Sequence, residues 1–166
     1  LGTIPETTLN LLPMPEATAT VRAALTSMEA ACRVLTKFTP EGLLPMAMEV
    51  VDRNCIGAIE ENFAFGLPPE AGAILIVAVD GSLAEVESNA ALIEKILQAN
   101  GGFDILRSRT KEEEDKLWDV RRAISPSLMK YGTVKINEDV VVPRSKVPEL
   151  VAPPTQYVCR QFRARR

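Results

Sequence analysis

The segment GAILIVAVDG, residues 72–81, constrains the fold most, because residues 73–79 are all apolar and leave no polar face. A strand points successive side chains to opposite sides, so a strand of this composition must be covered on both sides or packed against a second copy. The apolar run is far shorter than the roughly 20 residues that span a bilayer. We therefore predict an interior strand at the centre of one sheet.

A well-defined helix follows this strand. Ser82 and Glu85 have the spacing of a capping box, in which each side chain bonds to the backbone of the other residue. Asn100-Gly101-Gly102 ends the helix. Between these signals, apolar residues recur at helical spacing: Leu83, Val86, Ala90, Ile93 and Leu97.

The other elements give the order of the fold. Residues 19–26 and 46–52 read as strands, and between them Ser27 caps a helix that runs to Phe38. Residues 53–63 suit either a short helix or an elaborated loop, and FDILRSR, residues 103–109, reads as a strand. The resulting β-α-β, β-α-β order predicts an α+β, ferredoxin-like sandwich, with helices packed on one face of an antiparallel sheet. A chain of 166 residues suits one such domain.

An additional helix-strand unit follows the sandwich. Thr110 and Glu113 repeat the capping-box pattern, and Pro126 is expected to kink or restart the helix that they begin. The strand TVKINEDVVVP, residues 133–143, comes next. The apolar stripe of the helix consists of Leu117, Val120, Ile124 and Leu128.

Composition restricts the chemistry. The chain contains no histidine, which removes Ser-His and Cys-His nucleophile pairs and most transition-metal sites. Cys32, Cys55 and Cys159 are far apart and odd in number, so we expect buried free thiols. A net charge of -3 makes no general case for nucleic acid or membrane. The N-terminus lacks the pattern of a signal peptide, which favours a cytoplasmic location.

Five segments, in this order, resemble the FAD-linked oxidase family that includes the flavin subunit of glycolate oxidase, D-lactate dehydrogenases and D-2-hydroxyglutarate dehydrogenases. They are LGTIPETTLNLLPMPEA, PMAMEVVDRNCIGAIE, GAILIVAVDG, KLWDVRRAI and KINEDVVVPRSKVPELV. The resemblance implies that residues 1–18 are the remnant of a flavin-domain junction. Residues 19–151 would then form part of the C-terminal substrate or cap domain. Residues 152–166 are an unmatched basic tail, which its composition predicts to be disordered or, alternatively, a small basic arm for phosphate or anionic surfaces.

The resemblance also implies a cofactor that this chain does not hold alone. FAD would belong to the parent enzyme, whose FAD-binding domain would lie before Leu1, with Gly2 and Ile4 as the only matching flavin contacts. After Val151 the family continues into a histidine motif that this chain lacks. We therefore expect a fragment that is inactive by itself and packs on the FAD-binding domain. Other oxidase subunits or a second copy are further partners, and such a complex could attach peripherally to the inner membrane.

Arg121 and Lys135 are the substrate-binding residues that the resemblance implies, and Ser125 is added to them because of its place on the same helix face as Arg121. No catalytic residue or metal ligand is assigned. A guanidinium offers a two-pronged fork to the carboxylate of a 2-hydroxy acid. On a helix, Arg121 and Ser125 share a face with Trp118. Equally, Arg121 could be a surface residue paired with Glu114 or Asp115.

Two acidic groups have structural interpretations. Glu49 and Asp52 could be paired acid-base carboxylates, but Asp52 stands where a helix N-cap is expected. The run from Glu112 to Asp115 lies in a first helical turn, where negative charge complements the helix dipole, and this favours a structural role over metal binding.

A free-standing ferredoxin-like module that binds a small ligand or dimerises is the rival hypothesis, since this fold serves many functions. A cap domain should expose apolar surface where a flavin domain docks, whereas an independent module should be closed or symmetric. Nucleic acid is not an expected partner, because the arginines of residues 152–166 lie among few aromatic residues and the rest of the chain is acidic.

Overall fold

The computed structural model describes residues 2–11, 13–132 and 140–151. Its centre is a four-stranded antiparallel sheet in the order β2-β3-β1-β4. The strands are β1 (Ala17–Leu25), β2 (Ala47–Asp52), β3 (Ala73–Gly81) and β4 (Phe103–Arg107). The predicted α+β fold with ferredoxin-like element order is confirmed, and the apolar segment of residues 73–79 is an interior strand paired on both sides.

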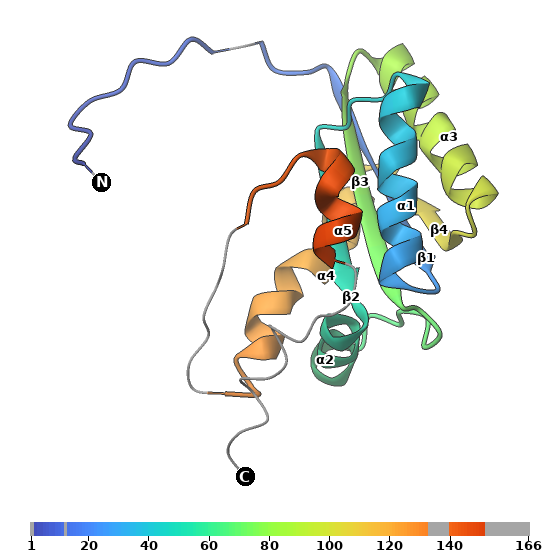
Figure 1. The fold of residues 1–166 in the computed structure, drawn as a ribbon. Helices are drawn as coiled ribbons and strands as arrows, with labels where there is room; N and C mark the ends of the chain where they lie inside the picture. The colour runs from blue at the N-terminus through green and yellow to red at the C-terminus, as the bar shows by residue number, and fades with distance from the viewer. Residues whose placement is uncertain (1, 12, 133–139, 152–166) are drawn as a thin grey trace.

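Two helices cover the first face of the sheet (Figure 1). They are α1 (Met28–Phe38) and α3 (Leu83–Ala99), which pack on alternate residues of β1 and β3 such as Leu25 and Leu75. Both predicted N-caps are present: the Ser27 side chain accepts the Ala30 N–H, and Ser82 forms the full capping box with Glu85. This is the helical layer that the element order predicted.

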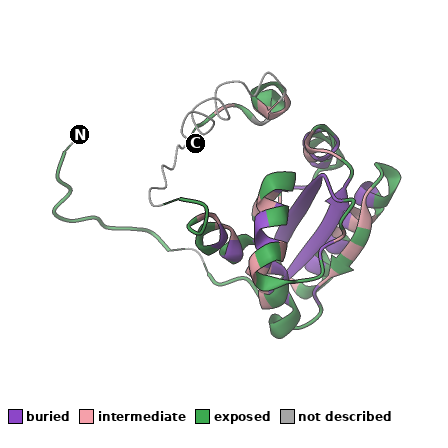
Figure 2. Cartoon of the chain, turned by 90° about the horizontal axis from the view of Figure 1, so that it is seen from below, coloured by how far each residue is buried: buried purple, intermediate pink, exposed green. Residues whose placement is uncertain are grey.

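The opposite face is covered as well, by α2 (Arg53–Phe63) and α4 (Lys111–Leu128). The segment that could have been a helix or a loop is therefore a helix, and the expectation of helices on one face describes only α1 and α3. Ile74 and Ile76 of β3 point toward this second layer and form a core with Val120 of α4. Figure 2 shows the buried strands lying between helices on both sides.

The segments outside the sandwich are less regular. Residues 2–11 run in an extended path away from the domain, and α5 (Val147–Val151), after a short 3-10 turn η2 (Arg144–Lys146), lies beside α1 (Figure 1). A second 3-10 turn, η1 (Thr39–Glu41), extends the end of α1. Of the predicted strand over 133–143, residues 133–139 lie outside the described part, and residues 140–143 have no regular structure. Residues 152–166 also lie outside it.

Three smaller expectations can be compared with the structure. Pro126 lies inside α4, which continues to Leu128 and so is not restarted there. Of the cysteines in the described part, Cys32 is a buried free thiol and Cys55 is half-buried, while Cys159 lies outside it. No helix in residues 2–11, 13–132 or 140–151 combines the length and apolar character needed to cross a membrane.

Candidate functional site

One row of side chains crosses the sheet beneath α4. Register pairs Glu49 of β2 with Ile76 of β3, Ile76 with Arg22 of β1, and Arg22 with Leu106 of β4. Directly paired residues of an antiparallel sheet point to the same side, so all four side chains face the layer of α2 and α4. This row brings two charged groups from distant parts of the sequence, Glu49 and Arg22, to the same face of the sheet.

Arg121 lies above the β2 end of this row. Its Nε donates to Glu49 Oε2 across 3.0 Å, and both side chains are partly exposed, at 45% and 38%. The alternative partners weighed from the sequence are engaged elsewhere: Glu114 with Lys111, and Asp115 with Lys111 and Arg122. Arg121 is thus a surface residue that is oriented by a sheet residue 72 positions away.

The other residues predicted for the substrate site have separate surroundings. Ser125 is exposed one turn further along α4, whereas Trp118 is half-buried and donates from Nε1 to Thr20 Oγ1 at 3.0 Å. Trp118 therefore anchors α4 to β1 and does not continue an exposed strip with Arg121 and Ser125. Lys135 lies outside the described residues.

A buried carboxylate stands beside Trp118. Glu114 is 5% exposed, and its oxygens accept hydrogen bonds from Thr18, Thr20 and Lys111 at 2.9 to 3.1 Å. Burial raises the pKa of Glu114, but these hydrogen bonds outweigh it and hold the pKa below its ordinary value. This carboxylate fastens the start of α4 to β1, in agreement with a structural role for the acidic run.

Arg22, which the sequence interpretation passed over, is the most deeply buried cation of this face. It is 7% exposed, and its Nη2 donates to Asp104 Oδ2 across 2.7 Å. Asp104 lies where the register between β1 and β4 shifts, and its φ of 47° is in the left-handed region, which Asp tolerates better than most residues. One signal was present in the sequence: Arg22 is the only charged residue of its strand.

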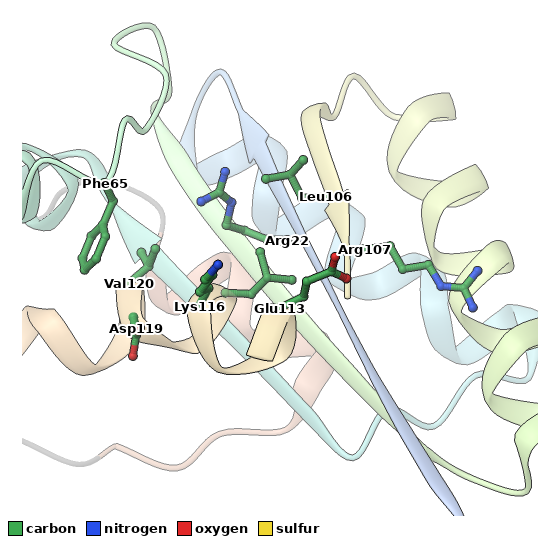
Figure 3. Close-up of a pocket in the computed structure, with 9 residues that line it drawn as sticks. Arg22, Phe65, Leu106, Arg107, Glu113, Lys116, Asp119 and Val120 are labelled. Atoms are coloured by element: carbon green, nitrogen blue, oxygen red, sulfur yellow. The ribbon is translucent and has the colours of Figure 1, made fainter. Parts of the chain in front are cut away.

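Arg22 forms part of the wall of a cleft of about 420 Å³ between α4, β4 and the loop after α2. Phe65, Leu106, Leu117 and Val120 supply apolar walls, and Lys116 stands at the rim (Figure 3). Arg107 also contributes to the lining, but its guanidinium is directed toward α3, where it pairs with Glu87 and Glu94 (Figure 3). The cleft thus combines an apolar body with one buried cation.

Gly2 and Ile4 are the residues for which a flavin contact is predicted. Gly2 and Ile4 lie in the extended N-terminal segment, where Ile4 is 80% exposed and a Cβ on Gly2 would meet nothing within 4 Å. These residues form no cradle for a flavin by themselves, so their role stays a prediction. In the described ranges, no cluster of three or more carboxylates or thiols is arranged to hold a metal ion.

Comparisons with known proteins agree with the resemblance. The family described as "FAD linked oxidases, C-terminal domain" matches residues 14–158. Glycolate oxidase subunit GlcD of Bacillus subtilis is 29% identical over 151 residues, which cover 91% of this chain and 32% of that protein. D-lactate dehydrogenase of Anaerostipes hadrus is 26% identical over 159 residues, covering 91% and 33%. The chain therefore spans about a third of the length of these curated relatives.

A solved structure shares the fold. Alkyldihydroxyacetonephosphate synthase superposes with a TM-score of 0.52 at 14% identity, over 71% of this chain and 24% of that chain. At this identity the likeness shows the fold alone.

Proposed function

This chain belongs to the family of FAD linked oxidase C-terminal domains, and on that premise we propose that it is the substrate-side domain of an FAD-dependent 2-hydroxy-acid oxidoreductase. The names of its relatives, glycolate oxidase subunit and D-lactate dehydrogenase, favour a glycolate or D-lactate type of substrate. In this proposal an FAD-binding domain, as part of the same protein or as a partner, supplies the cofactor. The flavin, when bound, supplies the redox chemistry.

The geometry of Arg121 is the observation that supports a substrate contact most directly. Glu49 holds the Nε side of its guanidinium, and in the described part of the chain Nη1 and Nη2 make no hydrogen bond. The open edge of the guanidinium can therefore donate two parallel hydrogen bonds to a carboxylate, with Glu49 limiting the orientations of the side chain. Ser125, exposed on the next turn, is the second candidate contact, for a hydroxyl or carbonyl oxygen of the substrate.

Exposed apolar side chains support the proposal that this chain packs on another domain and is not a free-standing module. Ile4, Leu9, Leu11 and Met14, all in the segment before β1, are at least 72% exposed. Isolated exposed apolar residues are common, but four in one extended segment suit a segment that packs on a neighbouring domain. We accordingly propose that the segment before β1 contacts the FAD-binding domain, and that the chain alone neither retains FAD nor turns over substrate.

Replacement of Arg121 by Lys tests the substrate contact in a protein that joins this domain to an FAD-binding domain. Lysine keeps the charge but loses the planar fork, so kcat/KM for the 2-hydroxy acid should fall about tenfold or more. Steady-state kinetics with glycolate and D-lactate measure the change. Arg33→Lys, an exposed position on α1 at the other face of the sheet, is the matched control and should leave kcat/KM unchanged.

Two results would contradict the proposal. Unchanged kinetics in Arg121→Lys would return Arg121 to a surface ion pair with Glu49. If the 166-residue chain alone retained FAD and oxidised glycolate or D-lactate, the proposal that a separate domain supplies the FAD would be refuted.

A further inference from the structure

The guanidinium of Arg22 is far from satisfied. A guanidinium has five N–H donors, and in the described residues only one nitrogen of Arg22, Nη2, has an acceptor, on Asp104. Its Nε is fully buried without a hydrogen-bond partner. A buried donor that lacks an acceptor is energetically costly, so a cation left this way beside an open cleft indicates a missing ligand.

The cleft has the size and character of a small-molecule site. Its volume of about 420 Å³ lies within the range of ligand pockets. The Arg22 guanidinium lies among Phe65, Leu106 and Val120 (Figure 3), so a ligand that reached it would also bury apolar surface.

The charges at the rim favour an anion. Asp119 is paired with Arg122, and Glu113 accepts the backbone N–H of Arg109. Lys116 is exposed and has no ion pair in the described part of the chain. At the wall of the cleft, Asp119 is therefore charge-paired and Glu113 hydrogen-bonded, while both cations have donors left for a ligand.

We propose that this cleft binds a carboxylate attached to an apolar group, with Arg22 as its main hydrogen-bond donor and Phe65 and Leu106 against the apolar part. The planar fork of the guanidinium matches a carboxylate in two-pronged geometry. Lys116 at the rim adds long-range attraction that is weakened by salt. The assignment rests on Arg22 and the cleft, and it holds whether or not the flavin enzyme assignment is correct.

This site is separate from the Arg121 surface. Successive residues of a helix are about 100° apart, so Asp119, which lines the cleft, and Arg121 project from opposite flanks of α4. Arg22 and Arg121 also have different carboxylate partners, Asp104 and Glu49. A ligand in the cleft therefore contacts a different set of residues from a substrate held by Arg121.

Nuclear magnetic resonance on the ¹⁵N-labelled chain provides the test. The buried Nε–Hε group of Arg22 should give a resolved cross-peak, which is assigned by its loss in Arg22→Lys. Titration with phenylacetate, a carboxylate on an aromatic ring, should shift this peak and the backbone amides of Leu106 and Val120 to saturation. Phenylacetamide, the neutral analogue of the same shape, should leave them in place.

Variants identify the groups that bind. Arg22→Lys should weaken phenylacetate binding about tenfold or more, measured from the amides of Leu106 and Val120. Asp104→Asn removes the competing carboxylate while keeping a residue that tolerates the left-handed backbone, and should tighten binding about threefold or more. Arg33→Met on α1 and Arg121→Met should each leave binding unchanged.

Several outcomes would overturn the assignment. They are an unshifted Arg22 peak at saturating phenylacetate, equal binding of phenylacetamide, and equal binding of inorganic phosphate. If Arg22→Lys does not fold, unchanged affinity in Asp104→Asn would overturn it instead. Loss of phenylacetate binding in Arg121→Met would also overturn it, because the ligand would then occupy the surface proposed for the 2-hydroxy acid. An effect of Arg121→Lys on kcat/KM for the 2-hydroxy acid concerns the proposed function and not the cleft.

Discussion

Buried charged residues on the α2–α4 face differ in how many of their hydrogen-bonding groups have a partner. Glu114 and Arg22 are both more than nine-tenths buried, but Glu114 accepts hydrogen bonds from three side chains whereas Arg22 uses one nitrogen. Weakening the hydrogen bonds of a satisfied buried charge destabilises the fold, whereas an incompletely satisfied one has donors left for a ligand. Sequence neighbours reveal only Lys111, three residues from Glu114, because the other partners of both charges lie more than 80 residues away.

Glu114→Gln should lower the free energy of unfolding by about 1–3 kcal/mol at neutral pH, because the charge-assisted hydrogen bonds from Lys111, Thr18 and Thr20 are weakened. The folded pKa of Glu114 lies below its ordinary value of 4.5, so its contribution is complete above that value and is lost as pH falls through the folded pKa. Urea unfolding of the parent chain and of Glu114→Gln, at pH values above and below 4.5, measures the difference between their free energies of unfolding. This difference should become smaller in acid.

Glu70→Gln, at an exposed position in the loop before β3, is the control for Glu114→Gln and should show little change at either pH. A constant difference between Glu114→Gln and the parent chain at every pH would contradict the role given to the Glu114 charge.

At the scale of elements, local signals located the helix starts. Ser27, Asp52, Ser82 and Thr110 each accept a backbone N–H three residues later, and all four residue types are strong N-caps. The caps at Ser27 and Ser82 and the preference for Asp52 as a cap are confirmed. In the second predicted box, Glu113 accepts the N–H of Arg109, one residue before the cap, so that box is only half formed.

Asp52→Ala should destabilise the protein by about 1 kcal/mol, because the Cys55 N–H loses its acceptor at 2.7 Å. Asp52→Asn keeps an oxygen in the same place and should cost much less. Chemical denaturation of the three chains gives the comparison. If the Asn variant were as unstable as the Ala variant, the carboxylate would be acting through its charge and not as a cap.

At the scale of the whole molecule, one sheet carries two cores. Residues of β3 alternate between the α1–α3 core and the α2–α4 core, so both helical layers share the same central strand. Trp118, the only tryptophan, joins the second layer to β1 through Thr20. Shared strands of this kind couple the two layers into one cooperative unit.

Denaturant unfolding followed by Trp118 fluorescence and by far-ultraviolet circular dichroism should therefore give coincident transitions. Trp118 reports the docking of α4, while circular dichroism reports the secondary structure of the whole chain. A fluorescence midpoint well below the circular dichroism midpoint would show instead that α4 leaves the sheet before the sandwich unfolds.

Much of the fold could be read from local patterns. Apolar alternation, caps and the order of elements predicted the central strand, α1, α3, α4 and the ferredoxin-like arrangement, because these depend on residues near one another in the chain. The helical state of residues 53–63 was left open, since an 11-residue segment of this mixed pattern has weak helical preference by itself. Its packing against α4 comes from the tertiary structure.

The sequence by itself determined that this chain forms an antiparallel α+β domain whose central strand must be covered on both sides or packed against a second copy, and its segments resemble the FAD-linked oxidases. Only the tertiary structure decided that α2 and α4 provide the second cover, that Glu49 holds Arg121, and that Arg22 lies almost buried at a cleft. The physical reason is distance along the chain: a cap or a stripe is set by neighbours, whereas a charge pair such as Arg22 and Asp104 exists only once strand register brings the two residues together.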